Sequence, residues 1–195
     1  RILVEGGLAL DAGQSNAAYG ITGDIAHIAT FGLSVGISPH AEVQIDGGLL
    51  QRLDVTGRTP GSPLFASTSV GVGGRTSGLE DFVIATKIRF TSETDTRPAF
   101  GARFGTKLPI ADPGKGIGLG TTDFFGSFLV AKTVQSVRTV GNVGLFVLGN
   151  PQAGQDHATA LAFGVSVARA VTDAFEVVGE VNGRLAPFDE IVPAG

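Results

Sequence analysis

The stretch from Glu80 to Ile110 contains two runs in which apolar and polar residues alternate at almost every position. Successive side chains of a β-strand point to opposite faces, so a period of two predicts two strands, each with one apolar and one polar face. The apolar faces are Phe82, Ile84, Thr86, Ile88 and Phe90 in the first run, and Phe100, Ala102, Phe104, Thr106 and Leu108 in the second. The polar residues Glu93 to Thr96 predict a turn between them. Such strands match the roughly 9–11 residues that a membrane-crossing strand needs, rather than the 5–6 usual in soluble sheets.

Similar runs elsewhere in the chain predict seven further strands. These are Ile2 to Leu10, Ala26 to Ile37, Ala41 to Leu53, Thr121 to Val134, Val137 to Asn150, Thr159 to Val171 and Ala174 to Leu185. Segments rich in Gly, Pro, Ser, Asn and Asp separate them and predict loops or turns. The longest are Asp11 to Asp24, Asp54 to Gly78 and Ala111 to Gly120, whereas Ser38 to His40, Gln135-Ser136 and Thr172-Asp173 predict tight turns.

The predicted connections alternate between long and short, which is typical of an up-and-down barrel in a bacterial outer membrane. We therefore expect residues 1–195 to form a single all-β domain, an antiparallel up-and-down transmembrane β-barrel. Bacterial barrels have an even number of strands, because an open edge would leave backbone groups unsatisfied in lipid. Nine predicted strands indicate an incomplete barrel, with twelve strands as the simplest complete form. The final residues, Val192 to Gly195, predict a loop.

Composition agrees with this interpretation in most respects. The sequence has 30 Gly and 13 Phe, and no run approaches the roughly 18 apolar residues of a transmembrane helix. It has no Trp and one Tyr, which is few for the aromatic girdles of a membrane barrel. The net charge of −4 and the lack of a Lys/Arg cluster argue against nucleic acid as a partner. The absence of Cys excludes thiol catalysis, disulfides and Cys-bound metals.

The sequence offers little support for an enzyme. His27, His40 and His157 are predicted at strand ends or turns, solvated and too widely separated for a catalytic or metal site. Gly71-x-Gly73-Gly74 and Gly116-x-Gly118-x-Gly120 are interpreted as turn glycines, because neither precedes a predicted helix or ends in the Lys-Ser/Thr of a phosphate loop. We expect no catalytic residue and no cofactor or metal.

If the apolar faces contact lipid, charged side chains on the opposite faces line the lumen. The candidate lumen residues are Lys87, Arg89, Arg103, Lys107, Glu42, Asp46, Glu176, Glu180 and Arg184. Charges along a pore select solutes, so one hypothesis is a polarised channel. The other is an internal ion-pair network that fills the barrel, in which Glu42 and Asp46 pair with Lys87 and Arg89 on the neighbouring strand. Lys132 lies on an apolar face near a strand end and is expected to snorkel out of it.

Three patches resemble the family named for the MetA pathway of phenol degradation, a group of outer-membrane barrels. The first is Phe31 to Ile37 with Ala41 to Ile45, and the second is Gly78 to Phe82 with Thr86-Lys87, where Glu80 replaces a Gly of the family pattern. The third is Gly105 to Pro109 with Gly116 to Gly120 and Asp123, where Ile110 replaces a small polar residue; Gly179 to Gly183 is similar to a late strand. The resemblance implies a barrel that passes small hydrophobic or aromatic compounds, and it implies no catalytic residues.

We therefore expect a porin-like passive channel in the outer membrane of a Gram-negative bacterium, with membrane lipid and small hydrophobic solutes as its partners. A closed structural or surface-binding barrel, its lumen plugged by charges, is the first alternative, and a soluble all-β binding domain is the second. The long loop from Asp54 to Gly78 is expected either to constrict the pore or to bind something outside it.

Overall fold

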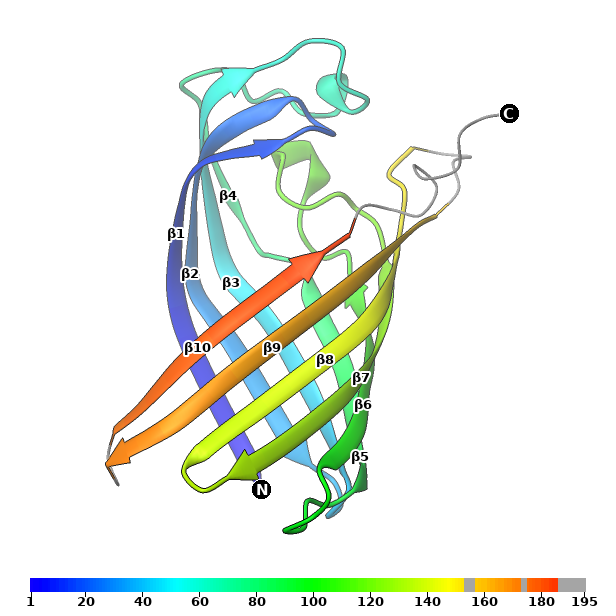
Figure 1. Ribbon diagram of the computed structural model, residues 1–195. Helices are drawn as coiled ribbons and strands as arrows, with labels where there is room; N and C mark the ends of the chain where they lie inside the picture. Colours follow the sequence, from blue (N-terminus) through cyan, green and yellow to red (C-terminus); the bar gives the residue numbers. More distant parts are fainter. Residues whose placement is uncertain (153–156, 173–174, 186–195) are drawn as a thin grey trace.

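A computed structural model describes residues 1–152, 157–172 and 175–185 of the chain (Figure 1). These residues form one antiparallel sheet. Its strands are β1 (Ile2–Asn16), β2 (Ile21–Gly36), β3 (Ala41–Arg58), β4 (Arg75–Gly78), β5 (Phe82–Thr91), β6 (Ala99–Leu108), β7 (Asp123–Val134), β8 (Val137–Leu148), β9 (Ala158–Thr172) and β10 (Phe175–Arg184). Two 3₁₀ turns, η1 (Phe65–Ser67) and η2 (Pro113–Lys115), complete the elements, and no helix among the described residues is long and apolar enough to cross a membrane.

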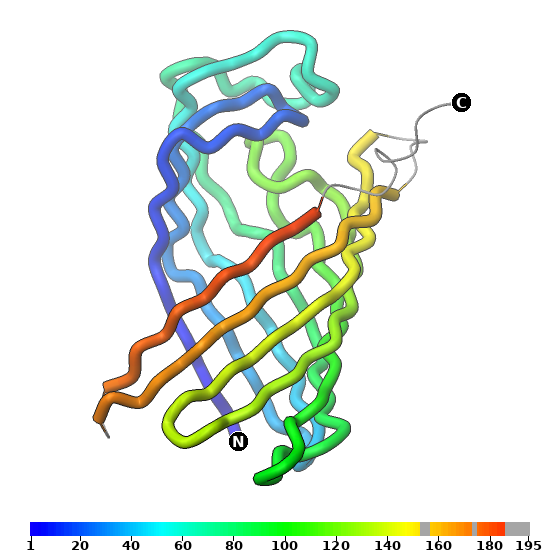
Figure 2. Tube along the Cα trace, viewed as in Figure 1, coloured from blue at the N-terminus to red at the C-terminus, as the bar shows by residue number. Residues whose placement is uncertain are grey.

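The strands follow one another in the order β1-β2-β3-β5-β6-β7-β8-β9-β10, and the sheet is curled (Figure 2). Its inner side has a hollow. The strand order confirms the predicted all-β, up-and-down architecture with its nine long strands. The short strand β4 pairs with β3 beside this path, inside the segment predicted as a loop. The path runs from β1 to β10, and no pairing joins these two strands in the described part of the chain. The predicted strand count of twelve stays a prediction, and the predicted terminal loop lies outside the described residues.

The predicted loop Asp11 to Asp24 is wrong for most of its length. β1 continues through Asn16 and β2 begins at Ile21, with Gln14 opposite Gly23 and Ser15 opposite Thr22. Backbone pairing makes no demand for apolar side chains, so a polar segment can extend a ladder without an alternating pattern. Residues 17–20 are therefore a tight turn, and the long–short alternation of connections fails at its first step.

Strand register keeps the two faces of the sheet apart, as the alternation predicted. Lys87 of β5 lies opposite Arg103 of β6, and the next residue, Ile88, lies opposite Ala102. Lys87 and Arg103 line the hollow, so their face is concave and the apolar face is convex. The convex face leaves many large apolar side chains exposed, including Val4, Leu8, Leu10, Ile28, Leu50, Ile84, Phe104, Phe124, Phe128, Val143, Leu145, Phe163, Val165 and Val181.

The one buried apolar cluster in the described residues lies at one end of the sheet, not in its middle. Its members are Tyr19, Ile21, Leu53 and Val55, which we call the cap cluster. Leu64, Val70 and Leu119 from the long connections pack against it. We call this end of the sheet the cap end, and the opposite end, with turns 37–40, 92–98 and 135–136, the short-turn end (Figure 1).

Glycines on the concave face allow neighbouring strands to approach closely where the sheet curls. A Cβ added to Gly101 would lie 2.6 Å from the carbonyl oxygen of Ile88, and one added to Gly105 would collide with the carbonyl oxygen of Ile84. In contrast, Gly126 on the convex face has open space at its Cβ position. Curvature at β5 and β6 therefore depends on residues without side chains at these concave positions.

We expect Gly105→Ala to lower the free energy of unfolding by about 1–3 kcal/mol, because the added methyl group meets backbone that cannot move aside cheaply. Gly126→Ala, one strand away, is the matched control and should leave stability unchanged or slightly higher. Urea unfolding in detergent micelles, followed by far-ultraviolet circular dichroism, measures both. Equal effects of the two substitutions would contradict this role of Gly105.

Candidate functional site

The concave wall near the short-turn end carries a row of paired charges. Lys87 Nζ lies 2.6 Å from Glu42 Oε1, and these residues are direct register partners on β5 and β3. This confirms the expected pairing between the two strands for Glu42. Asp46, however, pairs with Arg103 of β6, whose Nη2 lies 3.2 Å from Asp46 Oδ2, so its expected pairing with Lys87 or Arg89 is wrong.

Small residues explain how Arg103 reaches across a whole strand. Ala85 of β5 lies between Gln44 and Gly105 on the concave face, and it leaves room for a long side chain to pass over it. Arg103 Nε donates to Gln44 Oε1 at 2.7 Å, and the guanidinium also lies 4.9 Å from the centre of the Phe125 ring. A planar guanidinium can combine both contacts, so Arg103 is held in place on the wall.

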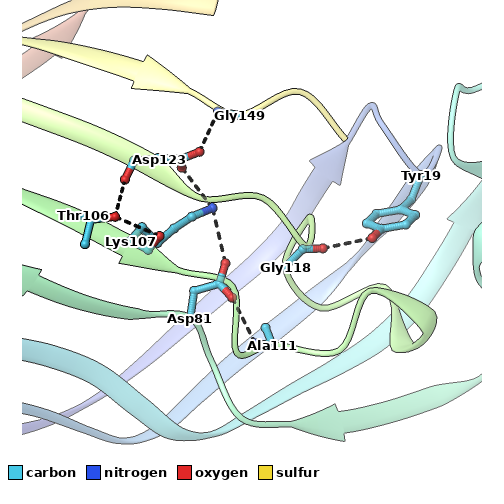
Figure 3. A network of polar contacts seen from close by, with 8 residues as sticks. All are labelled: Tyr19, Asp81, Thr106, Lys107, Ala111, Gly118, Asp123 and Gly149. Carbon is cyan, nitrogen blue, oxygen red and sulfur yellow. Dashed lines mark hydrogen bonds and ion pairs between the residues drawn. The ribbon is translucent and has the colours of Figure 1, made fainter. Parts of the chain in front are cut away.

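Lys107 joins three segments at the cap end (Figure 3). Its Nζ lies 3.3 Å from Asp81 Oδ2 and 2.9 Å from Asp123 Oδ2. The second oxygen of Asp81 accepts from the backbone N–H of Ala111 at 3.0 Å, and that of Asp123 accepts from Gly149 N–H at 2.9 Å. The side chains of Lys107, Asp81 and Asp123 are 22, 13 and 16 % exposed. Lys107 thus lies on the concave face as predicted, where it links the end of β6 to the start of β7 and to the connection before β5.

Tyr19 of the cap cluster is fully buried, and its hydroxyl donates to the carbonyl oxygen of Gly118 at 3.0 Å (Figure 3). Gly118 has φ +69°, and a Cβ there would lie 2.7 Å from Ala111 Cβ. Gly116 and Gly120 also have positive φ, which confirms this segment as turn glycines. Burial raises the pKa of the Tyr19 phenol above 10.0, and the nearby carboxylates of Asp112 and Asp81 raise it further.

His27 lies inside β2 rather than at a strand end, and it is not simply solvated. Its Nδ1 lies 2.8 Å from Glu80 Oε1 and its Nε2 lies 3.5 Å from Asp11 Oδ2. The expectation for His27 was wrong because β1 and β2 extend through the predicted loop. His40 and His157 are exposed, and His40 is in the turn at the short-turn end. No group of three or more His, Cys, Asp or Glu in the described residues is arranged to hold a metal ion.

The remaining predicted lumen residues are exposed and have few side-chain partners among the described residues. Arg89 is exposed on the concave face, and its Nη2 donates to the carbonyl oxygen of Pro39 at 2.6 Å. Glu176, Glu180 and Arg184 lie on exposed positions of β10, where Glu180 accepts from Asn182 at 2.8 Å. Neither Glu176 nor Arg184 has an ion-pair partner within the described ranges.

The segment from Asp54 to Gly78, predicted as one loop, is partly strand and partly cap. β3 extends through Arg58, and β4 occupies its last four residues. The Arg58 guanidinium holds the intervening chain, because its Nη2 donates to the carbonyl oxygen of Phe65 at 2.7 Å and its charge lies 4.3 Å from the centre of the Phe65 ring. Leu64 and Val70 pack on the cap cluster, so this segment helps to cover the cap end.

Comparison with family models, with curated proteins and with solved structures found no match. The resemblance suggested by the sequence patches therefore stays a prediction. Two of those patches meet in space, because Asp81 comes from one, and Lys107, Gly118 and Asp123 come from the other (Figure 3). Their residue types are accounted for by the Lys107 cross-link and by the turn at Gly118.

We expect Tyr19, the single Tyr of the sequence, to ionise above pH 10 in the folded protein. Near-ultraviolet absorbance of tyrosinate measures this directly. The folded state favours the neutral phenol over the phenolate. The contribution of buried Tyr19 to stability is therefore complete below about pH 10, and it is lost as pH rises through the raised pKa. Tyr19→Phe should remove that loss, and a normal titration of folded Tyr19 would contradict its burial.

We expect Lys107→Met to lower the free energy of unfolding by about 1–3 kcal/mol, because it leaves two largely buried carboxylates facing each other without a cation. Lys132→Met is the matched control. Lys132 turns toward the exposed turn 92–98, where its Nζ donates to the carbonyl oxygen of Thr94 at 2.6 Å. Its expected snorkelling stays a prediction. The loss of Lys132 should cost less than about 1 kcal/mol. Urea unfolding compares the two, and equal costs would argue against a special role for Lys107.

Proposed function

We propose that this chain forms the wall of an outer-membrane β-barrel that acts as a passive channel for small hydrophobic or aromatic compounds. The observation that carries the proposal is the division of one curled sheet into an exposed apolar convex face and a charged concave face. Val4, Leu10 and Val181 are more than 70 % exposed on the convex side. Lys87, Arg103 and their carboxylate partners occupy the other side.

The convex face is difficult to reconcile with water as its surroundings. Burying one Val, Leu, Ile or Phe side chain contributes about 1.5–3 kcal/mol, and the strands expose such residues in rows. A soluble all-β domain would cover these rows with a second layer, and no segment of the described residues does so. Lipid hydrocarbon would cover them without any further protein, which favours a membrane barrel.

The second candidate, a structural or surface-binding barrel plugged by its own charges, is favoured by one observation. Glu42, Asp46, Lys87 and Arg103 are joined in ion pairs across the concave face, and paired charges can bridge a lumen as well as line it. An open channel passes solutes with its ion pairs intact, whereas a charge-plugged barrel passes them only after an ion pair is broken.

Solute uptake by liposomes that contain the refolded protein tests both. The probes are phenylalanine, a small aromatic zwitterion that crosses lipid slowly, and raffinose, a bulky sugar. We expect the wild-type protein to admit phenylalanine and to exclude raffinose. The matched variants are Arg103→Gln, which breaks the Asp46 pair, and Arg52→Gln, which breaks an ion pair with Asp54 outside the hollow.

A wild-type protein that admits phenylalanine supports the channel. If only Arg103→Gln admits it, the charge-plugged barrel is correct. If a well-folded protein remains soluble without detergent and enters no liposome, both membrane functions are wrong.

A further inference from the structure

The hollow at the short-turn end combines unpaired positive charge with apolar wall. Its volume is about 1000 Å³, at the upper limit of pockets that hold small organic ligands. The basic side chains that line it are Arg1, Lys87, Arg89, Arg103 and Arg138, and the acidic ones are Glu42 and Glu93. Basic groups therefore outnumber acidic ones along this part of the concave wall.

The acidic side chains that line the hollow already have partners, and so do two of the basic ones. Glu42 is occupied by Lys87 at 2.6 Å. Glu93 accepts from the backbone N–H of Thr133 at 2.6 Å and lies 3.5 Å from Lys132 Nζ. Arg103 is neutralised by Asp46. The lining carboxylates are thus already engaged with other partners.

Arg89 and Arg138 keep their charges uncompensated. Among the described residues, the Arg89 side chain bonds the carbonyl oxygen of Pro39 alone, and a single carbonyl leaves the other donors of a guanidinium unused. The Arg138 side chain makes no hydrogen bond or ion pair within the described residues, and both arginines are exposed to the hollow. Glu176 of β10 lies toward the same end but does not line the hollow.

Apolar residues adjoin these arginines on the same wall. Leu129 and Ala131 of β7 and Val140 of β8 also line the hollow. Val140 is the register partner of Ala131, which places the two side by side. A guanidinium recognises carboxylate oxygens, and an adjoining apolar wall accommodates hydrocarbon or an aromatic ring.

We propose that this hollow binds small organic anions, with aromatic carboxylates as the best fit, on the solute path of the channel. The proposal rests on the proposed function for its place on a solute path. The binding itself depends only on the folded wall. Arg89 and Arg138 draw in and hold the carboxylate, and Leu129, Ala131 and Val140 contact the rest of the molecule.

Equilibrium dialysis of radiolabelled benzoate against the protein in detergent micelles tests the site without any need for conduction. Benzamide, its neutral analogue of the same shape, is the control ligand. We expect benzoate to bind at least about tenfold more tightly than benzamide, as the loss of one charge-assisted hydrogen bond implies. The double substitution Arg89→Gln/Arg138→Gln should remove that preference.

Two further variants control for folding and for nonspecific charge. Arg89→Lys/Arg138→Lys keeps the positive charge and should retain most of the benzoate binding. Arg52→Gln removes a positive charge outside the hollow and should leave binding unchanged. Equal binding of benzoate and benzamide, or an equal loss in Arg52→Gln, would overturn the site.

Planar-bilayer recordings under a KCl gradient separate the site from the channel. We expect chloride to be preferred over potassium, and the Gln double variant to move the permeability ratio toward one. Benzoate binding in a protein that never conducts would retain the site and overturn the channel. Conduction in a protein that does not distinguish benzoate from benzamide would retain the channel and overturn the site.

Discussion

The register of the antiparallel ladder is the constraint on which the rest of this structure depends. Where backbone groups pair along each strand, side-chain direction alternates except at β-bulges, and residues opposite each other share a face. The row through Glu42, Lys87 and Arg103 is therefore concave, and the next row, through Val43, Thr86 and Phe104, is convex. A slip of one residue would exchange the two rows and place Lys87 among the phenylalanines. The charged concave wall and the apolar convex band therefore have the same cause, which is the register of the strands.

Basic residues have different roles at the two ends of this wall. Lys107 at the cap end has two carboxylates within ion-pair distance, and these are themselves fixed by backbone N–H groups. Among the described residues, the Arg89 guanidinium at the short-turn end has one partner, the carbonyl oxygen of Pro39. The difference comes from the connections. Long connections at the cap end bring Asp81 over the concave face, whereas the tight turns at the other end contribute backbone and few carboxylates.

The strands and their faces could be predicted because a period of two reports side-chain direction directly. The Glu42–Lys87 pair followed, since direct neighbours on adjacent strands are close whatever the rest of the wall does. The Asp46–Arg103 pair did not follow, because it requires knowing that Ala85 leaves a passage across β5. The cap was beyond reach for a related reason: Tyr19, Leu64 and Leu119 come from connections far apart in sequence, and periodicity says nothing about how connections pack. His27 was misplaced because polar residues around Gln14 hid the continuation of the ladder.

The distinction between paired and unpaired charges also bears on how a charged wall can be open to solutes. A lysine 2.6 Å from a carboxylate forms a dipole whose field falls off quickly, whereas an isolated guanidinium on a low-dielectric wall attracts anions over a distance near the Debye length, about 8–10 Å. Under the proposed function, the ion pairs of Lys87, Arg103 and Lys107 hold the shape of the wall and contribute little to selection. Selection would then fall to the few groups that the tight turns leave without partners, which is why the charge balance at the short-turn end matters more than the total charge of the lumen.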